Sequence, residues 1–171
     1  MNNNNNNSFL ELIDVLDKEY ACHLLLLSAA EEMNTALKQN RVEDIRRTSK
    51  KYDEYTFTIK ELEEKRLMLS DLICKKDTSK AGHANLLMVI ENAPEELKEK
   101  ISNLRGKIKD IVAKISKINY SNQVLLQEAL YSASKMFEMV MNNEKNRFLA
   151  YKKHGKKDLS PVTTNIVDRV I

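Results

Sequence analysis

The sequence has few of the residues that build turns, disulfides and catalytic sites. Its 171 residues include three glycines, two prolines, two cysteines, three histidines and no tryptophan. Because turns usually use glycine and proline, this scarcity argues against a fold made of many short strands. The cysteines, Cys22 and Cys74, match no metal-binding or redox spacing, and they need no oxidising compartment.

Long apolar runs are missing as well. The sequence has no stretch of about 18 apolar residues, so we expect no membrane-spanning helix. Its start, an unbroken asparagine run at Asn2–Asn7, lacks the cationic and apolar regions of a secretory signal, and we expect a cytoplasmic protein. Residues 1–8 have nothing to bury and are expected to be disordered, with Ser8 and Glu11 forming a capping box for the first helix.

The groups that catalysis or metal binding would need form no known motif. None of the three histidines (His23, His83 and His154) follows a glutamate by three positions, the pairing used by carboxylate metal sites in helical bundles. The sequence also has no glycine-rich phosphate loop. We therefore expect no catalytic residue, no metal site and no cofactor, and we expect that the protein is not an enzyme.

Charge and helical periodicity are what the sequence has instead. Charged residues make up 31% of it and hydrophobic residues 42%, a composition that suits long amphipathic helices. From Pro94 to Asn142 no further proline occurs, and mostly apolar positions step alternately by four and three, which is the period of a helix seam. The seam positions are Leu97, Ile101, Leu104, Ile108, Ile111, Ile115, Ile118, Asn122, Leu125 and Ala129. A helix of about 45–50 residues would be roughly 70 Å long, so it must lie against other long helices or a partner protein.

The residues before this seam predict an antiparallel helical hairpin. We expect a first helix from Phe9 to Leu37, a tight turn at residues 38–41 and a second helix from Val42 to Ile73. The second helix has a seam of its own at Tyr52, Tyr55, Ile59, Leu62, Arg66, Leu69 and Ile73. A loop at residues 75–84 and a short apolar helix at residues 86–90 then lead to the long helix.

The predicted fold class is therefore all-α. We expect a long antiparallel hairpin within a coiled-coil bundle of about three long helices, covering residues 9–143. Residues 144–171 are expected to form a basic, flexible tail. Its last residues, Ile166, Val167, Val170 and Ile171, are spaced to form one apolar helical turn.

Two features of the long helix have two interpretations each. Asn119 and Asn122 interrupt the apolar seam, where a buried amide would set register or pairing, or else both face water. The run Met136–Met141 is rich in methionine, which suits a surface that accepts several different helices, or else it is ordinary core at a helix end.

Positive charge is concentrated in one short segment. Between Lys145 and Lys157 there are basic residues at 145, 147, 152, 153, 156 and 157, and no acidic residue. Such a segment is either simply solvated or meets nucleic acid or anionic lipid; we expect no nucleic acid partner, because no recognition fold accompanies it.

The order of motifs along the chain resembles the FlgN-like flagellar export chaperones. A long charged hairpin is followed by Leu86-Leu87, by a connector at Glu91–Glu96 and by a helix with further motif residues. Those residues are Ile118, Asn119, Asn122, Leu125 and Leu126, and the series closes with Tyr151 four residues before Gly155. The likeness covers about residues 9–157.

The resemblance implies a cytosolic, non-catalytic chaperone of the flagellar type III export system. Such proteins hold the C-terminal helices of hook-associated proteins and deliver them to the cytosolic domain of the export gate. By resemblance and by the apolar pattern, the client-binding residues would be Asn122, Leu125, Leu126, Ala129, Leu130, Met136 and Phe137. Tyr151 and Gly155 would contact the gate. The family usually has glycine, proline and acidic residues after this tyrosine, whereas this chain has a basic segment, Lys152–Lys157.

An exposed apolar seam also predicts that the free protein forms a homodimer. The alternative function is a structural coiled-coil scaffold or tether, which would form a permanent oligomer and release no client.

Overall fold

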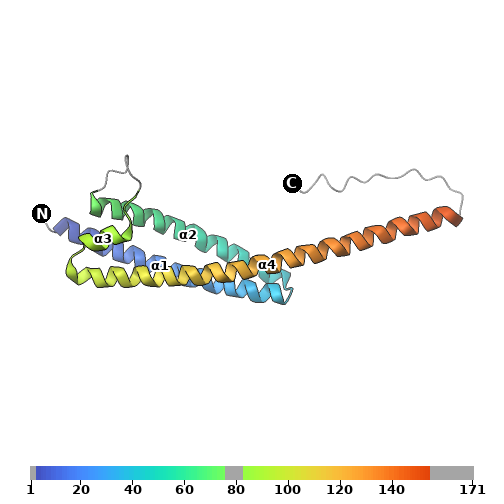
Figure 1. The fold of residues 1–171 in the computed structure, drawn as a ribbon, viewed down its shortest axis with the longest axis horizontal. Helices are drawn as coiled ribbons and strands as arrows, with labels where there is room; N and C mark the ends of the chain where they lie inside the picture. The colour runs from blue at the N-terminus through green and yellow to red at the C-terminus, as the bar shows by residue number, and fades with distance from the viewer. Residues whose placement is uncertain (1–2, 76–82, 155–171) are drawn as a thin grey trace. The chain divides into compact units, whose positions relative to one another are not determined.

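The computed structural model describes the backbone of residues 3–75 and 83–154 and the side chains of residues 6–75 and 83–142. Its elements are α1 (Asn3–Lys38), α2 (Val42–Cys74), α3 (Leu86–Asn92) and α4 (Glu95–His154), and the described residues include no strand (Figure 1). The all-α prediction is confirmed. The chain divides into two compact units, Met1–Gln127 and Glu128–Ile171, which are described separately below.

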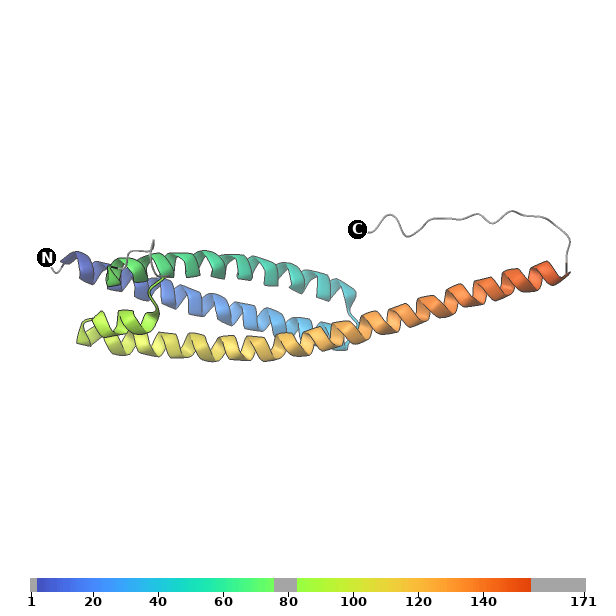
Figure 2. The same ribbon diagram turned by 45° about the horizontal axis from the view of Figure 1, so that its top comes forward.

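Helices α1 and α2 form the predicted antiparallel hairpin (Figure 2). The turn between them is tight because Asn40 adopts a left-handed conformation (φ 53°), which asparagine tolerates better than most residues. The backbone N–H of Arg41 donates to the Ala36 carbonyl at 3.0 Å and closes this turn. A connection this short forces α2 to return along α1.

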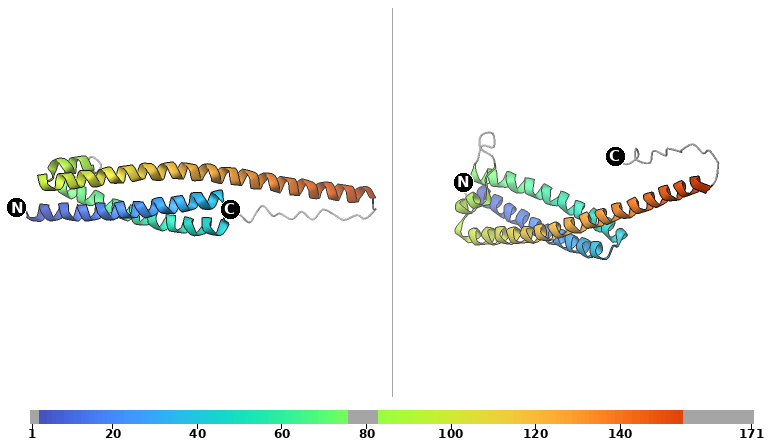
Figure 3. Two further views of the ribbon diagram at one scale, coloured as in Figure 1. Left: turned by 90° about the horizontal axis from the view of Figure 1, so that it is seen from below. Right: turned by 45° about the vertical axis from the view of Figure 1, so that its right-hand side comes forward.

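The core of the first unit joins all four helices. In α1 the buried apolar residues recur at helical spacing, and Leu12 and Leu16 are fully buried. Leu69 and Ile73 of α2 and Val89 of α3 pack into the same cluster, which α4 completes with Ile101 and Leu104. A second cluster of Leu26, Ile111 and Ile115 extends the contact of α1 with α4. Within this unit α4 runs alongside α1 in the same direction (Figure 3).

The two predicted seams are confirmed where they meet this core. On α4, Ile101, Leu104, Ile111, Ile115 and Asn122 are buried, and Leu97 and Ile108 are partly buried against the core. On α2, Tyr52, Tyr55, Ile59 and Leu62 are partly buried and pack against the two clusters.

The short connection between α2 and α4 is held by one buried carboxylate. Asp71, near the end of α2, accepts hydrogen bonds from the Ala84 backbone N–H and from His83 Nδ1, each at 2.6 Å. Asn85 then caps α3 by accepting a bond from the Met88 N–H at 3.0 Å. Pro94 fits the first turn of the helix that follows, where Glu95 and Glu96 lie at its positive end.

Two predicted boundaries are wrong. α1 begins at Asn3 rather than at Phe9, so Ser8 lies inside the helix and does not cap it; extending an existing helix costs little. α4 has 60 residues rather than 45–50 and ends at His154, so residues 144–154 of the predicted tail are helical. No proline or glycine interrupts the sequence between Gly106 and Gly155, and this stretch is rich in good helix formers. Within the described ranges, no helix is long and apolar enough to cross a membrane.

Candidate protein-binding surface

A buried amide cluster lies where α4 crosses the end of α1. The Nδ2 group of Asn34 donates to Asn122 Oδ1 at 2.8 Å and to Ser121 Oγ at 3.0 Å. The Nδ2 group of Asn122 donates in turn to the Ala30 carbonyl at 3.0 Å. These bonds decide the open question about the seam amides in favour of a buried polar contact, because Asn122 is only 5% exposed.

The second seam amide also has a protein partner. Asn119 donates from Nδ2 to the Tyr52 hydroxyl at 2.7 Å, which links α4 to α2. Slipping α4 by one residue would break these hydrogen bonds and leave the buried Asn34 and Asn122 amides without them, at a cost of about 1–3 kcal/mol for each unpaired group. We therefore assign Asn119 and Asn122 to the register of α4 in the bundle. The nitrogen and the oxygen of the Asn122 amide are both bonded within the bundle and the residue is buried, so its expected direct contact with a client would require the bundle to open.

One buried ion pair accounts for the arginine in the α2 seam. Arg66 Nε donates to Glu19 Oε2 at 3.0 Å, and its Nη2 donates to Glu63 Oε1 at 3.1 Å. Burial raises the pKa of the Glu19 carboxyl above its ordinary value, and the neighbouring Arg66 charge opposes that shift. His23 lies one turn further along α1, where its Nδ1 donates to the Glu19 backbone carbonyl at 2.8 Å. These groups hold α1 to α2, and the described residues contain no cluster suited to a metal ion.

The predicted client residues at the end of the first unit differ in exposure. Leu125 is half-buried and Leu126 is 40% exposed. Leu125 is therefore placed to support the bundle, whereas Leu126 presents much of its side chain to a partner.

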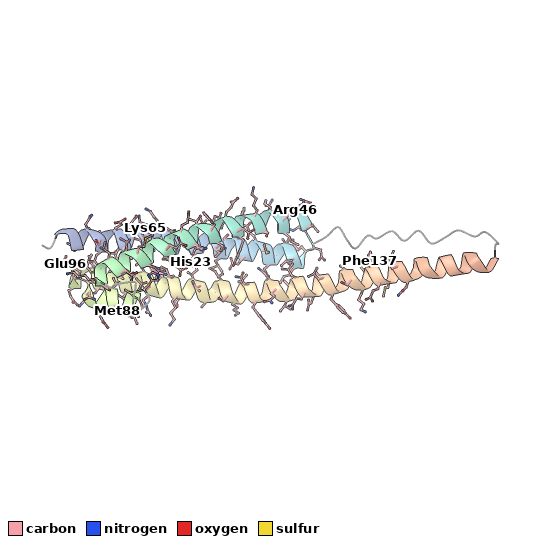
Figure 4. All side chains as sticks on the ribbon, turned by 90° about the horizontal axis from the view of Figure 1, so that it is seen from above. His23, Arg46, Lys65, Met88, Glu96 and Phe137 are labelled. Atoms are coloured by element: carbon pink, nitrogen blue, oxygen red, sulfur yellow. The ribbon has the colours of Figure 1, made fainter. Side chains whose placement is uncertain are left out.

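The second unit has the more prominent apolar surface. Seven large apolar side chains on α4, between 41% and 70% exposed, are Leu130, Tyr131, Met136, Phe137, Met139, Val140 and Met141. The ordinary-core interpretation of the methionine run is therefore wrong among the described residues. Figure 4 shows the Phe137 side chain on this part of the helix.

These side chains are ordered on the helix. Leu130, Ala133, Phe137 and Val140 follow one another at steps of three and four, so they form one stripe. The predicted residues Ala129 and Met136, together with Met141, lie within about 80° of the centre of this stripe at 100° per residue. We call Ala129, Leu130, Ala133, Met136, Phe137, Val140 and Met141 the apolar stripe.

Charge lies on another side of the same helix. Lys135 Nζ forms an ion pair with Glu138 Oε2 at 3.1 Å and lies 5.8 Å from the centre of the Tyr131 ring. Both interactions are local to one helix and leave the apolar stripe uncharged. An uncharged, methionine-containing helix face is typical of surfaces that bind another amphipathic helix.

Comparison with protein families places the chain in a known family. The family model described as FlgN protein matches residues 1–158, which is most of the chain. The chain belongs to the FlgN family. FlgN proteins are flagellar export chaperones that bind hook-associated proteins, and they are not an enzyme family. No curated protein and no solved structure matches the chain.

The two predicted gate residues of this FlgN protein lie at the limit of the structure. Tyr151 belongs to the helical backbone of α4, so it is not in a tail as expected, and its side chain is outside the described residues. Gly155 lies outside the described residues altogether. Their role at the gate stays a prediction.

Sequence reasoning missed two groups of exposed apolar residues on this FlgN chain. Tyr131 was not among the predicted site residues, although its spacing from Lys135 signals a shared helix side. In the first unit, Met68 and Leu72 on α2 and Leu87 on α3 are at least 50% exposed. The positions of Met68 and Leu72 off the α2 seam were the available signal for those two residues.

Proposed function

We propose that this FlgN protein holds the C-terminal helix of a hook-associated protein on the apolar stripe and delivers it to the export gate in the cytoplasm. The observation that carries the proposal is the exposure of the stripe: Phe137 alone leaves 65% of its surface open. An isolated protein gains nothing from exposing a continuous apolar helix face, whereas a binding protein needs one.

The geometry suits a helical client. Anchors spaced by three and four residues on one helix match those of a second amphipathic helix, as in helix-in-groove recognition. The methionines have flexible, polarizable side chains that adjust to different partners. A chaperone that serves more than one hook-associated protein would benefit from this tolerance.

The other predicted residues support this function in different ways. Leu126 is proposed as a separate client contact in the first unit, where Leu125 and Asn122 hold the helix that carries it. Tyr151 and Gly155 are proposed to meet the gate's cytosolic domain. The basic residues Lys152–Lys157 favour an acidic docking surface there. Where neither a client nor another segment covers the stripe, two copies of it would pair, which predicts a weak homodimer.

Two phenylalanines with equal exposure provide the test. Phe137 in the stripe and Phe57 on α2 are both 65% exposed. We expect Phe137→Ala to weaken binding of a hook-associated protein's C-terminal segment, measured by calorimetry, by about 10- to 100-fold, because a central aromatic anchor is lost. Phe57→Ala should leave this affinity unchanged.

Other outcomes would contradict the proposal. Equal losses from both variants would mean that binding is unspecific. If Phe137→Ala has no effect and the protein forms an oligomer that client does not dissociate, the scaffold function applies instead.

A further inference from the structure

One apolar segment of the chain is not explained by family membership. The family match ends at residue 158, and Ile166, Val167, Val170 and Ile171 lie beyond it. Their spacing is i, i+1, i+4 and i+5, which places all four on one side of a helix, whereas a strand would alternate. Thr163, Thr164 and Asn165 precede them, and such residues favour helix starts. We call residues 166–171 the apolar end segment.

The apolar stripe offers this segment a surface of suitable size. The stripe extends from Ala129 to Met141, which corresponds to roughly 18 Å of helix, while a six-residue helical segment needs about 9 Å. Neither apolar surface carries charge: the stripe has none, and at 100° per residue Asp168 and Arg169 would lie on the side of a helix opposite the four apolar residues of the end segment. Either could bury the other without burying an unpaired charge.

The chain between them is long enough. From Phe137 to His154, where α4 ends, the helix covers about 26 Å. Residues 155–165 provide eleven residues, which reach at most about 36–40 Å when extended. The end segment can therefore return to Phe137 within the same unit of the same molecule.

We propose that the apolar end segment docks on the apolar stripe of its own chain and occupies it until a client arrives. A tether of this length creates an effective concentration on the order of millimolar, so even a weak contact is substantially populated. The client must then displace the segment, which lowers its apparent affinity and protects the stripe from self-association. The competition with client depends on the proposed function, but the docking itself does not.

The methyl groups of the methionines can show whether the end segment docks on the stripe when no client is present. Met136 and Met141 lie in the stripe, whereas Met33, Met68 and Met88 lie in the first unit. We would record methyl NMR spectra of the full chain, of a chain ending at Ser160 and of an Ile166→Asp, Val170→Asp variant. The matched control is Thr163→Asp, Thr164→Asp, which adds the same charge to polar positions of the same region.

The proposal predicts that truncation and the Ile166→Asp, Val170→Asp change shift the methyl signals of Met136 and Met141. The methyl signals of Met33, Met68 and Met88 should not shift. Because Met68 is 65% exposed, a shift of its signal would indicate nonspecific contact. The control variant should resemble the full chain. Truncation should also tighten client binding by roughly three- to tenfold, because the client no longer competes with the end segment for the stripe.

Three results would overturn it. Unchanged stripe methyls after truncation would mean that the segment does not dock. Equal shifts at Met68 would mean unspecific contact, and shifts that vanish on dilution would mean that the segment binds a second copy. Shifted stripe methyls without any client binding would leave the docking intact and reject the proposed function instead.

Discussion

Asn34 on α1 and Asn122 on α4 donate and accept a 2.8 Å hydrogen bond inside the bundle, although 88 positions separate them in the sequence. Among the described residues, every buried side-chain nitrogen and oxygen has a hydrogen-bond partner. The hydrogen bond between the two amides makes one register of α4 on α1 more stable than the registers shifted by one or two residues.

This contact predicts that two changes differ in how much they destabilise the protein. Asn122→Ala should destabilise the protein by about 1–3 kcal/mol, because the Asn34 amide and the Ala30 carbonyl lose their buried partner. Replacing both Asn34 and Asn122 by leucine should cost less stability, since no side-chain amide is left buried without its partner. Urea unfolding measures both values.

The double leucine variant should nevertheless lose register. Cysteine pairs placed across α1 and α4 should crosslink in one register in the natural chain and in several in the variant. Crosslinking in a single register in both proteins would show that apolar packing alone sets the alignment.

The ion pair between Glu19 and Arg66 predicts a dependence on pH. Arg66→Met should leave a buried carboxylate without its partner and destabilise the protein near neutral pH by about 3 kcal/mol. Burial already raises the pKa of Glu19, and without Arg66 that shift is no longer opposed.

The direction of this dependence follows from the raised pKa. Protonated Glu19 is preferred in the folded state, so the variant should be most stable below the ordinary glutamate pKa. It should lose stability as the pH rises through the raised value. Thermal unfolding at several pH values tests this, and adding Glu19→Gln to the variant should remove the pH dependence. A variant whose stability increases over that range would contradict the assignment.

The exposure of Leu126 predicts a separable binding effect. Leu126→Ala should reduce client affinity by about 1–2 kcal/mol with little change in unfolding, since 40% of the side chain is already exposed. Leu125→Ala should instead affect stability, because Leu125 is half-buried in the bundle. Calorimetry with client and urea unfolding distinguish the two. If Leu125 controls affinity and Leu126 does not, the client lies on the other side of the helix.

The gate hypothesis is tested at Tyr151. Tyr151→Ala should leave helix content and client affinity unchanged and weaken binding to the cytosolic domain of the export gate at least tenfold, as expected for an aromatic anchor. Tyr120→Ala is the matched control, because Tyr120 is 71% exposed in the first unit. Loss of client binding in Tyr151→Ala would place this residue in the client surface.

Much of the bundle could be predicted because its signals are local. The turn at Asn40 and the seam from Leu97 to Ile115 follow from backbone preference and helical periodicity, which act over a few residues. The start of α1 and the end of α4 were misplaced because no residue at either predicted position interrupts a helix. Between Asn143 and His154 the polar composition was taken for a tail, yet nothing there opposes a helix.

The candidate site was only partly predictable. Its position on α4 followed from the apolar residues after Asn122, but the role of Asn122 depended on Asn34, a partner far away in the sequence. No local pattern distinguishes an amide that meets another amide from one that faces water.

The sequence by itself determined the helices, the hairpin and the apolar face of α4, because hydrophobic periodicity indicates which side of a helix is apolar. The tertiary structure decided which part of that face is core and which part is surface. Ile101 is covered by the other helices of its bundle, and Phe137, in the apolar stripe later in the same helix, is left 65% exposed. The two residues differ because hydrophobic periodicity predicts only that a helix face will be buried. Which segment or partner buries it depends on the packing of parts of the chain that are distant in sequence.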